Sequence, residues 1–398
     1  MALARSLIHW GAILQRSRVS GELKRRAWVE VDLDALKYNI EQIRRHIGLK
    51  SLMAVVKADA YGHGAVVVGQ TAIECGARYL GVATLEEGVQ LREAGLGSPI
   101  VILGAINTPA EVQTVLDWNL QPTLCTPKQV LTCAESLTRS HPVHLKIDTG
   151  MGRLGAPWLE AVDFVRLART QPRLQVESVY SHLATADEPA SEVLDQQYLR
   201  FVAVLDALKA AGIAPPLTHL ANSAATLRNP ELHYDMVRVG GALYGLYPAP
   251  CFKNLLDLRP VMQVRARITQ LKTVPAHFGV SYGHLYRTDG PTRLATVAIG
   301  YADGVPRNLS GRLEAIVRGK RVPQVGAITM DQLILDVSSI PEVCETEIAT
   351  FLGRDGDEMI GAEVWAQALG TIHYEVVCGF KHRLPRVVHR SSTVRQLQ

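Results

Sequence analysis

Residues 51–60 read Ser-Leu-Met-Ala-Val-Val-Lys-Ala-Asp-Ala, a short and almost wholly apolar run that ends in a lysine. Such a run is typical of a strand buried on both faces, as in a parallel sheet. Similar runs recur as far as residue 240, separated by longer amphipathic stretches. The eight runs are Ser51–Lys57, Tyr79–Thr84, Pro99–Leu103, Leu120–Leu124, Val143–Asp148, Leu174–His182, Thr218–Asn222 and Met236–Gly240. Eight strands alternating with helices predict a parallel sheet closed as a (β/α)8 TIM barrel over residues 27–260.

The stretches between these runs carry helix signals. Asp34–Ile47 begins at a candidate Asp cap and repeats apolar residues at helical spacing, and Pro157–Thr170 and Glu192–Ala211 follow the same pattern. Prolines at Pro109, Pro127 and Pro157 sit where helices would begin. The alternative architecture is a doubly wound open sheet, which usually carries GxGxxG after its first strand. Here Ala-Asp-Ala follows the first strand, so the sequence favours the barrel.

Beyond residue 260 the pattern changes to short strands without long helices between them. The candidate strands are Val261–Val274, Arg293–Gly300, Leu313–Val317, Arg321–Val325, Gln332–Val337 and Glu347–Leu352, and Val364–Leu369 is at most a short helix. Residues 261–398 are therefore predicted to form a second, mainly β domain. Residues 27–33, which alternate with period two, are a candidate to pair with it.

Residues 1–26 show no core periodicity, and we expect a flexible, dispensable extension. They are rich in arginine and contain one acid, Glu22, so an organelle transit peptide is the alternative interpretation.

Composition narrows the classes of function. The chain has 398 residues and a net charge of only +4, without a long basic tract, so nucleic-acid binding is not expected. No apolar run approaches the length of a transmembrane helix, so a membrane partner is not expected either. The six cysteines are scattered and form no CxxC pair, which indicates reduced thiols in a cytoplasmic protein. No HExxH motif occurs, and His63, His182 and His219 lie far apart in sequence, so we expect no catalytic metal.

Chemically active side chains gather at the carboxyl ends of the predicted strands, where a barrel places its active site. Lys57 ends the first run, and desolvation at the barrel mouth would lower the pKa of its amine and favour Schiff-base chemistry. A lysine that reaches solvent from the barrel rim is the alternative interpretation. The other residues at these positions are Lys146, Asp148, Arg153, His182, His219, Asn222, Ser223, Arg238, Gly240 and Gly241.

The ends of the seventh and eighth strands favour a phosphate site. Asn222 and Ser223 open a short helical segment, which offers a hydroxyl and an N–H at a positive helix end. Gly240 and Gly241 let the backbone approach an anion closely. Ordinary capping and a turn would also explain either feature alone, but barrels often bind phosphate with these two loops together.

These residues belong to a recognisable series of motifs. Residues 54–64, Ala-Val-Val-Lys-Ala-Asp-Ala-Tyr-Gly-His-Gly, resemble the cofactor-lysine signature of the alanine racemases. Five further segments resemble that family's other motifs in order: residues 146–155, 219–223, 281–283, 299–304 and Met330-Asp331. The resemblance spans about residues 27–390. It implies a pyridoxal-phosphate-dependent isomerase that interconverts L-alanine and D-alanine and supplies D-alanine for peptidoglycan, working as a homodimer with shared active sites.

The resemblance also implies a role for each matching residue. Lys57 would hold pyridoxal phosphate covalently and act as the base on the D-alanine side, and Tyr282 of the partner subunit would be the base on the L-alanine side. Arg238 would face the pyridine nitrogen. The remaining cofactor residues would be Tyr61, His182, Asn222, Ser223, Gly240 and Gly241. Arg153 and Met330 would contact the substrate, with Lys146, His219, Tyr301, Arg307 and Asp331 in supporting positions. Lys146 matches a lysine that is carbamylated in some members, where it orients the arginine here numbered Arg153.

These implied roles agree with elementary chemistry. Racemisation removes a proton from one face of Cα and returns one to the other, so a base on each face suffices. A phenol titrates near pH 10, and a cation such as Arg238 acting through His182 would lower the pKa of Tyr282. Arginine does not give up its proton, so Arg238 would leave the pyridine nitrogen unprotonated and limit transamination.

Two positions depart from the family pattern, and three other functions compete. His382 stands where some members have a tyrosine near the phosphate, and Gly241 replaces a larger apolar residue. The nearest rival function is a serine or broader-specificity racemase on the same fold, which a secretory signal would favour. A barrel decarboxylase has no need of Tyr282. A non-catalytic cofactor-binding protein has no need of the β domain that carries Tyr282 and Met330.

Overall fold

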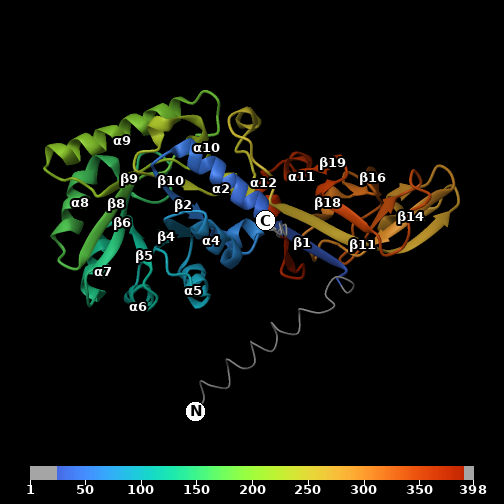
Figure 1. Ribbon diagram of the computed structural model, residues 1–398, viewed down its shortest axis with the longest axis horizontal. Coiled ribbons are helices and arrows are strands. Elements are labelled where there is room, and N and C mark those ends of the chain that lie inside the picture. Colours follow the sequence, from blue (N-terminus) through green and yellow to red (C-terminus); the bar gives the residue numbers. More distant parts are fainter. Residues whose placement is uncertain (1–24, 390–398) are drawn as a thin grey trace, which may run out of the picture. The chain divides into compact units, whose positions relative to one another are not determined.

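The computed structural model describes residues 25–389, which fall into two compact units. Asp32–Val261 forms one, and Met262–Val387 together with residues 25–31 forms the other (Figure 1). Among the described residues, no helix has the length and apolarity needed to cross a membrane.

The first unit is a parallel sheet of eight strands in the order β10-β2-β3-β4-β5-β6-β8-β9. The end strands are joined by hydrogen bonds from Asp235 N to Thr218 O and from Arg238 N to Ala221 O, both 3.0 Å, which bring the sheet round into a barrel. The predicted TIM barrel is confirmed. The strands are β2 (Ser51–Val55), β3 (Tyr79–Val82), β4 (Ile100–Ala105), β5 (Gln121–Leu124), β6 (His141–Asp148), β8 (Leu174–Tyr180), β9 (Leu217–His219) and β10 (Met236–Val239).

Amphipathic helices alternate with the strands and cover the outside of the barrel (Figure 1). Thr84 and Thr108 begin two of them with a capping box, in which the threonine hydroxyl and a glutamate three residues on satisfy exposed N–H groups. Covered by helices outside and packed inside, β2 is buried at every position. The longer helices are α2 (Leu33–Ile47), α4 (Ala65–Glu74), α5 (Leu85–Glu93), α6 (Pro109–Asp117), α7 (Pro127–Ser136), α8 (Ala161–Thr170) and α9 (Glu192–Ala210).

Two predicted helix starts were wrong. The cap of α2 is Asp32 and not Asp34: the Asp32 carboxylate accepts hydrogen bonds from the backbone N–H groups of Asp34 and Ala35, both at 2.9 Å. Pro157 does not begin a helix because Ala156–Pro157 forms β7, a short strand paired with β6. A 3₁₀ turn follows, and α8 begins at Ala161.

The second unit is mainly β. Its nine-stranded sheet runs β19-β18-β15-β16-β17-β14-β11-β1-β20, and β18 also pairs with β11, which closes the strands between them into a ring. The first strand, β1 (Ala27–Asp32), pairs antiparallel with β11, with Val29 opposite Val264. The others are β11 (Met262–Val274), β14 (Thr292–Val297), β15 (Glu314–Val317), β16 (Lys320–Val325), β17 (Leu333–Asp336), β18 (Ile348–Asp355), β19 (Glu358–Ile360) and β20 (Arg386–His389).

Four short strands and one short α-helix of this domain were not predicted: the hairpin of β12 (Gly279–Val280) and β13 (Tyr286–Arg287), the strands β19 and β20, and α12 (His373–Cys378). They are too short to show periodicity. The helix α11 (Ala362–Leu369) agrees with the predicted short helix.

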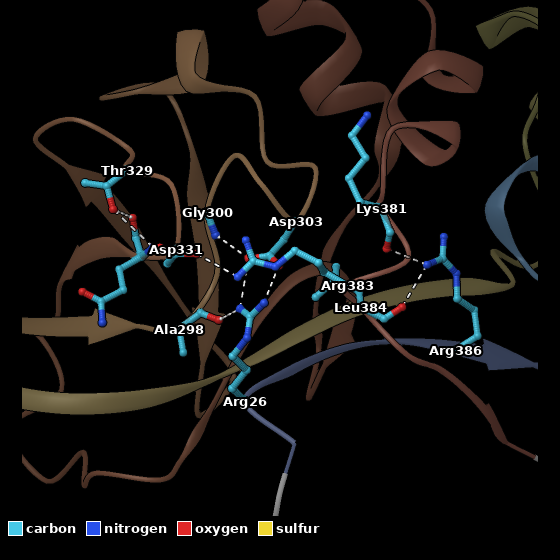
Figure 2. A network of polar contacts seen from close by, with 11 residues as sticks. Arg26, Ala298, Gly300, Asp303, Thr329, Asp331, Lys381, Arg383, Leu384 and Arg386 are labelled. Atoms are coloured by element: carbon cyan, nitrogen blue, oxygen red, sulfur yellow. Dashed lines mark hydrogen bonds and ion pairs between the residues drawn. The ribbon is translucent and has the colours of Figure 1, made fainter. Parts of the chain in front are cut away.

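The described chain begins inside the β domain. The Arg26 guanidinium donates to the Ala298 carbonyl at 2.7 Å and pairs with the fully buried carboxylate of Asp303 at 2.5 Å (Figure 2). Arg267 donates to the Arg25 carbonyl at 3.1 Å. Arg25 and Arg26 are therefore part of the folded domain and not of an extension, whereas residues 1–24 lie outside the described residues.

Candidate active site

Lys57 lies just beyond the last residue of β2 and begins an unusual turn. The next four residues, Ala58–Tyr61, have φ between 52° and 55°, the left-handed region that non-glycine residues avoid. Hydrogen bonds hold this turn: Ala60 N donates to Val56 O at 2.8 Å, and the Asp59 carboxylate accepts from Ala65 N at 2.7 Å. Strained backbone of this kind persists only where its surroundings over-determine it, and it gathers at functional sites.

The ends of β9 and β10 form a cradle beside this turn. Ser223 Oγ accepts the backbone N–H of Gly240 at 3.0 Å, and Asn222 caps the short helix α10 (Ser223–Arg228) through a 3.0 Å bond from Ala225 N. A Cβ added to Gly240 would lie 2.6 Å from the Tyr61 hydroxyl. A larger residue at position 240 would therefore displace the Tyr61 ring, and Gly241 follows in a buried 3₁₀ turn. The structure brings together the residues that were predicted to surround a phosphate.

Tyr244 packs beside Tyr61 and helps to hold it in place. Its hydroxyl donates to the Val55 carbonyl at 2.9 Å, which ties it to the end of β2. Its ring lies 5.1 Å from the ring of Tyr61 and stacks on His63 at 4.5 Å. Sequence reasoning missed Tyr244, and the Gly-Gly-Ala-Leu-Tyr segment gave no signal beyond the two glycines.

Arg238 lies on β10 and is buried. One guanidinium nitrogen lies 2.7 Å from His219 Nδ1, and the other donates to the Ser181 carbonyl at 2.7 Å and the Leu220 carbonyl at 3.1 Å. Burial lowers its pKa to about 10, so it stays a cation near neutral pH. Within residues 25–389 none of its hydrogen-bond partners is a carboxylate, so no such group neutralises its charge there.

His182 also faces Arg238, with 3.2 Å between His182 Nδ1 and the guanidinium. Burial first, and then the charge of Arg238, hold the pKa of His182 well below its usual value. The ring is therefore neutral. Since arginine can only donate, Nδ1 is the acceptor and the proton resides on Nε2.

Lys146 and Arg153 come from β6 and the loop after it. Lys146 is buried, and burial, followed by the charge of Arg238, lowers its pKa to about 8. The Lys146 ammonium lies 5.7 Å from the centroid of the Tyr180 ring. Asp148 holds the loop by accepting the N–H groups of Gly150 and Met151 at 2.9 Å, and Arg153 follows, exposed.

In the β domain, Tyr282 projects from the turn between β12 and β13. Tyr282 is 72% exposed, and three residues around it have positive φ: Ser281 at 61°, Gly283 at 69° and His284 at 45°. Ser281 Oγ donates to the Ala327 carbonyl at 2.7 Å and anchors the turn. The fold thus holds an exposed phenol on a tightly bent, fixed turn.

Tyr301 and Met330 lie on two loops that are bonded to each other. Tyr301 N donates to Thr329 O and Ala302 N donates to Met330 O, each at 3.0 Å. A Cβ on Gly300 would lie 2.3 Å from the Thr329 carbonyl, so the close approach requires glycine. Arg307 is exposed in the 3₁₀ turn that follows the Tyr301 loop, and His382 occupies an exposed turn near the end of the domain.

Side chains clamp these two loops together (Figure 2). Arg383 lies between two carboxylates, 3.5 Å from Asp303 and 2.8 Å from Asp331. Asp303 also accepts the backbone N–H of Gly300 at 3.0 Å. Sequence reasoning did not assign Asp303 or Arg383, although Asp303 lies within the Gly-Tyr-Ala-Asp-Gly motif.

The barrel residues fit pyridoxal phosphate. At Gly240 the backbone approaches the Tyr61 hydroxyl closely, Ser223 and the backbone N–H groups beside it suit a phosphate, and Arg238 suits a ring acceptor. Lys57 follows β2, the strand that pairs directly with β10. Over residues 25–389 no three His, Cys, Asp or Glu side chains lie together in a way that could hold a metal ion.

Comparison with known proteins agrees with this arrangement. Residues 31–248 match the family model described as "Alanine racemase, N-terminal domain", and residues 261–388 match "Alanine racemase, C-terminal domain". Alanine racemase of Nostoc sp. is 56% identical over 368 residues, 91% of this chain and 95% of its own length. That of Synechocystis sp. is 53% identical over 370 residues, 92% of this chain and 100% of its own length.

Solved structures are similar over the same extent. A crystal structure of alanine racemase from Bacillus anthracis with bound L-Ala-P has a TM-score of 0.86 and 39% identity, and covers 92% of this chain and 96% of its own. One from Streptomyces lavendulae has a TM-score of 0.85 and 40% identity, with coverage of 92% and 97%. Both domains, their order and the sequence identity agree, and the chain therefore belongs to the pyridoxal-phosphate-dependent alanine racemase family.

Proposed function

We propose that this protein interconverts L-alanine and D-alanine in the cytoplasm, with Lys57 and Tyr282 as the two bases, and supplies D-alanine for peptidoglycan. The observation that carries the reaction class is Arg238, a buried cation that has no carboxylate partner in the described part of the chain. A group that cannot give up a proton favours simple proton return at Cα over transamination. The six free cysteines support the location.

Lys57 and Tyr282 divide the proton transfers between them. Pyridoxal phosphate, when bound, supplies the electron-accepting ring that makes the Cα–H acidic. Lys57 Nζ exchanges the proton on one face, and Tyr282 Oη of the partner subunit exchanges it on the other. His182 supports the phenol: its Nδ1 accepts from Arg238, so Nε2–H is the atom available to donate to Tyr282 Oη of the partner subunit.

The other site residues bind and orient. Tyr61, Ser223 and the N–H groups of Gly240 and Gly241 would hold the phosphate, with Asn222 fixing the helix start. Arg153 and Met330 would bind the substrate carboxylate, with Arg153 held in place by Lys146. Tyr301 would line the entrance, with Arg307 and Asp331 in supporting positions, and His219 would orient Arg238.

The proposal requires a homodimer in which each site takes residues from both chains. Tyr282 is 72% exposed, Leu285 73% and Met330 53% in the single chain. Large apolar side chains gathered on such fixed loops are typical of a surface that another chain covers.

The test is a racemisation assay on the purified holoenzyme. We expect conversion of L-alanine to D-alanine and little turnover of L-serine, with no activity in Lys57→Ala. Borohydride reduction followed by peptide mapping should place the pyridoxyl group on Lys57. Faster turnover of serine would favour the broader-specificity racemase, and a label on Lys146 would refute the assignment of Lys57.

A further inference from the structure

A chain of hydrogen bonds crosses the interior of the barrel. It starts at Arg238, whose guanidinium lies 2.7 Å from His219 Nδ1, and His219 Nε2 lies 2.9 Å from Ser178 Oγ. Ser178 Oγ lies 2.7 Å from His144 Nδ1, and His144 Nε2 lies 2.9 Å from Gln121 Oε1. The five residues come in order from β10, β9, β8, β6 and β5, so each bond joins neighbouring strands of the sheet.

The three residues in the middle of this hydrogen-bond chain have no contact with water. His144, Ser178 and His219 are each 0% exposed. A buried polar group without a partner destabilises a fold by about 1–3 kcal/mol, whereas apolar residues would fill the same space without that risk. Three consecutive buried polar side chains, all paired, therefore indicate a selected network and not a packing accident.

The direction of every hydrogen bond in this chain follows from Arg238, its first member. Arginine can only donate, so His219 Nδ1 must accept and the proton of His219 lies on Nε2. That N–H donates to Ser178 Oγ, whose own O–H is then free to donate to His144 Nδ1. His144 in turn carries its proton on Nε2 and donates to an oxygen, Gln121 Oε1. All four bonds point away from Arg238.

Both rings are neutral. Burial alone lowers the pKa of His144 to about 3, and burial followed by the charge of Arg238 holds the pKa of His219 well below its usual value. The titratable rings packed on His144 are Tyr79 at 6.5 Å and His219 at 6.4 Å between centroids. Tyr180 stacks on His219 at 4.5 Å, which prevents that ring from turning.

We propose that Ser178, His144 and Gln121 are positioning residues for Arg238. The directed chain fixes His219 as a neutral acceptor, and this acceptor holds the Arg238 guanidinium in one orientation without neutralising its charge. The inference rests on the proposed function, in which Arg238 faces the cofactor ring. It extends that site to Gln121, which is four hydrogen bonds away from Arg238.

The direction of the chain is tested on the unaltered holoenzyme. With ¹⁵N-histidine labelling, NMR distinguishes a protonated Nδ1 from a protonated Nε2 in each ring. We expect both His144 and His219 to be neutral with the proton on Nε2 at pH 6 and at pH 9. A charged ring, or a proton on Nδ1 of either histidine, would overturn the proposal without any reference to catalysis.

The functional link is tested by breaking the middle of the chain. Ser178→Ala removes the hydroxyl that joins the two histidines, and we expect kcat to fall about ten-fold with KM little changed, because only the orientation of Arg238 is loosened. Thr123→Val is the matched control. It removes an equally buried hydroxyl, 3.0 Å from the Tyr180 hydroxyl and outside the chain. Equal effects of the two variants would contradict the proposal.

The far end of the chain gives the sharpest test. In Gln121→Glu, a carboxylate beside His144 would raise the pKa of that ring. Once protonated, His144 Nδ1 would donate to Ser178 Oγ and would reverse the hydrogen bond that it accepts in the wild type. We expect the ratio of mutant to wild-type kcat to fall as pH is lowered, together with a change of the His219 signal. Gln121→Met adds no charge and should show a pH-independent ratio. A pH-independent ratio in Gln121→Glu would refute the link between the hydrogen-bond chain and catalysis. This variant also provides the test of that link if Ser178→Ala does not fold.

The two proposals fail in different ways. A protein that racemises neither alanine nor serine contradicts the proposed function, and the NMR experiment then still decides whether the chain has the stated direction. A protein that racemises alanine but responds equally to Ser178→Ala and Thr123→Val contradicts only the positioning role.

Discussion

Lys146 is a lysine whose surroundings favour the uncharged amine. It is buried near two arginines, and its pKa falls to about 8. The folded pKa lies below that of an unfolded lysine, so the unfolded state binds more protons between about pH 8 and pH 10.4, and stability rises with pH across that window. Below pH 8 both states are protonated and this unfavourable contribution stays constant.

The same shift predicts reaction with carbon dioxide. Only a neutral amine forms a carbamate, and roughly half of Lys146 is neutral at pH 8 against about one part in a hundred at pH 6. We expect ¹³C-labelled bicarbonate to give a carbamate signal in NMR at pH 8 that is much weaker at pH 6. The signal should vanish in Lys146→Met. A signal that persists in that variant would place the carbamate elsewhere.

At the scale of elements, the barrel was predictable from sequence and the turns that carry the site were not. All eight strands of the barrel follow the apolar runs because burial on both faces demands such runs. The left-handed turn at Ala58–Tyr61 contains no glycine that would have predicted it. Ser281, beside Tyr282, also has a positive φ without being a glycine. These conformations are held by individual hydrogen bonds, such as that from Ala65 N to the Asp59 carboxylate, that hydrophobic periodicity does not reveal.

In the candidate site, too, some residues were predictable from sequence and others were not. Lys57, Ser223 and Arg238 could be found because each follows from its place near a strand end. The buried partner Ser178 could not, because a single serine within a strand looks like any other.

Arg26, the residue before the first strand of the β domain, yields a stability prediction. Arg26 pairs with the buried carboxylate of Asp303 but is itself 37% exposed, so solvent screens part of the interaction. We expect Arg26→Ala to destabilise the protein by about 1–2 kcal/mol, since Arg383 remains as a second cation near Asp303. Thermal unfolding should show a midpoint lower by a few degrees.

A truncation separates this effect from that of the preceding segment. Removal of residues 1–24 is predicted to leave activity and the thermal midpoint nearly unchanged, whereas removal of residues 1–26 should match Arg26→Ala. Equal midpoints for the two truncations would show that the Arg26 pair adds nothing.

At the scale of the whole molecule, shared sites predict rescue between two inactive variants. Lys57→Ala and Tyr282→Phe homodimers should each be nearly inactive because each lacks one base. After subunit exchange, a heterodimer has one site with both lesions and one with neither, so activity should return to at most about half per heterodimer. The assay follows D-alanine formation in the mixture with cofactor supplied.

The control is a mixture of either variant with itself, carried through the same exchange. If Tyr282 serves the site of its own chain, every site in the heterodimer keeps a lesion. Absence of rescue despite verified exchange would then exclude the shared site.

The left-handed turn after Lys57 has a consequence for chirality. A backbone with φ near +53° is the mirror image of a right-handed helical turn, the conformation that D-residues adopt with ease. Ala58 is exposed, so D-alanine placed there by chemical ligation would relieve the turn by about 1–2 kcal/mol without displacing a neighbour. Denaturant unfolding would measure the gain, and D-alanine at exposed Ala110, in the right-handed helix α6, should instead destabilise. The segment next to the proposed catalytic lysine would then be better built from D-alanine, the product that we propose this protein makes.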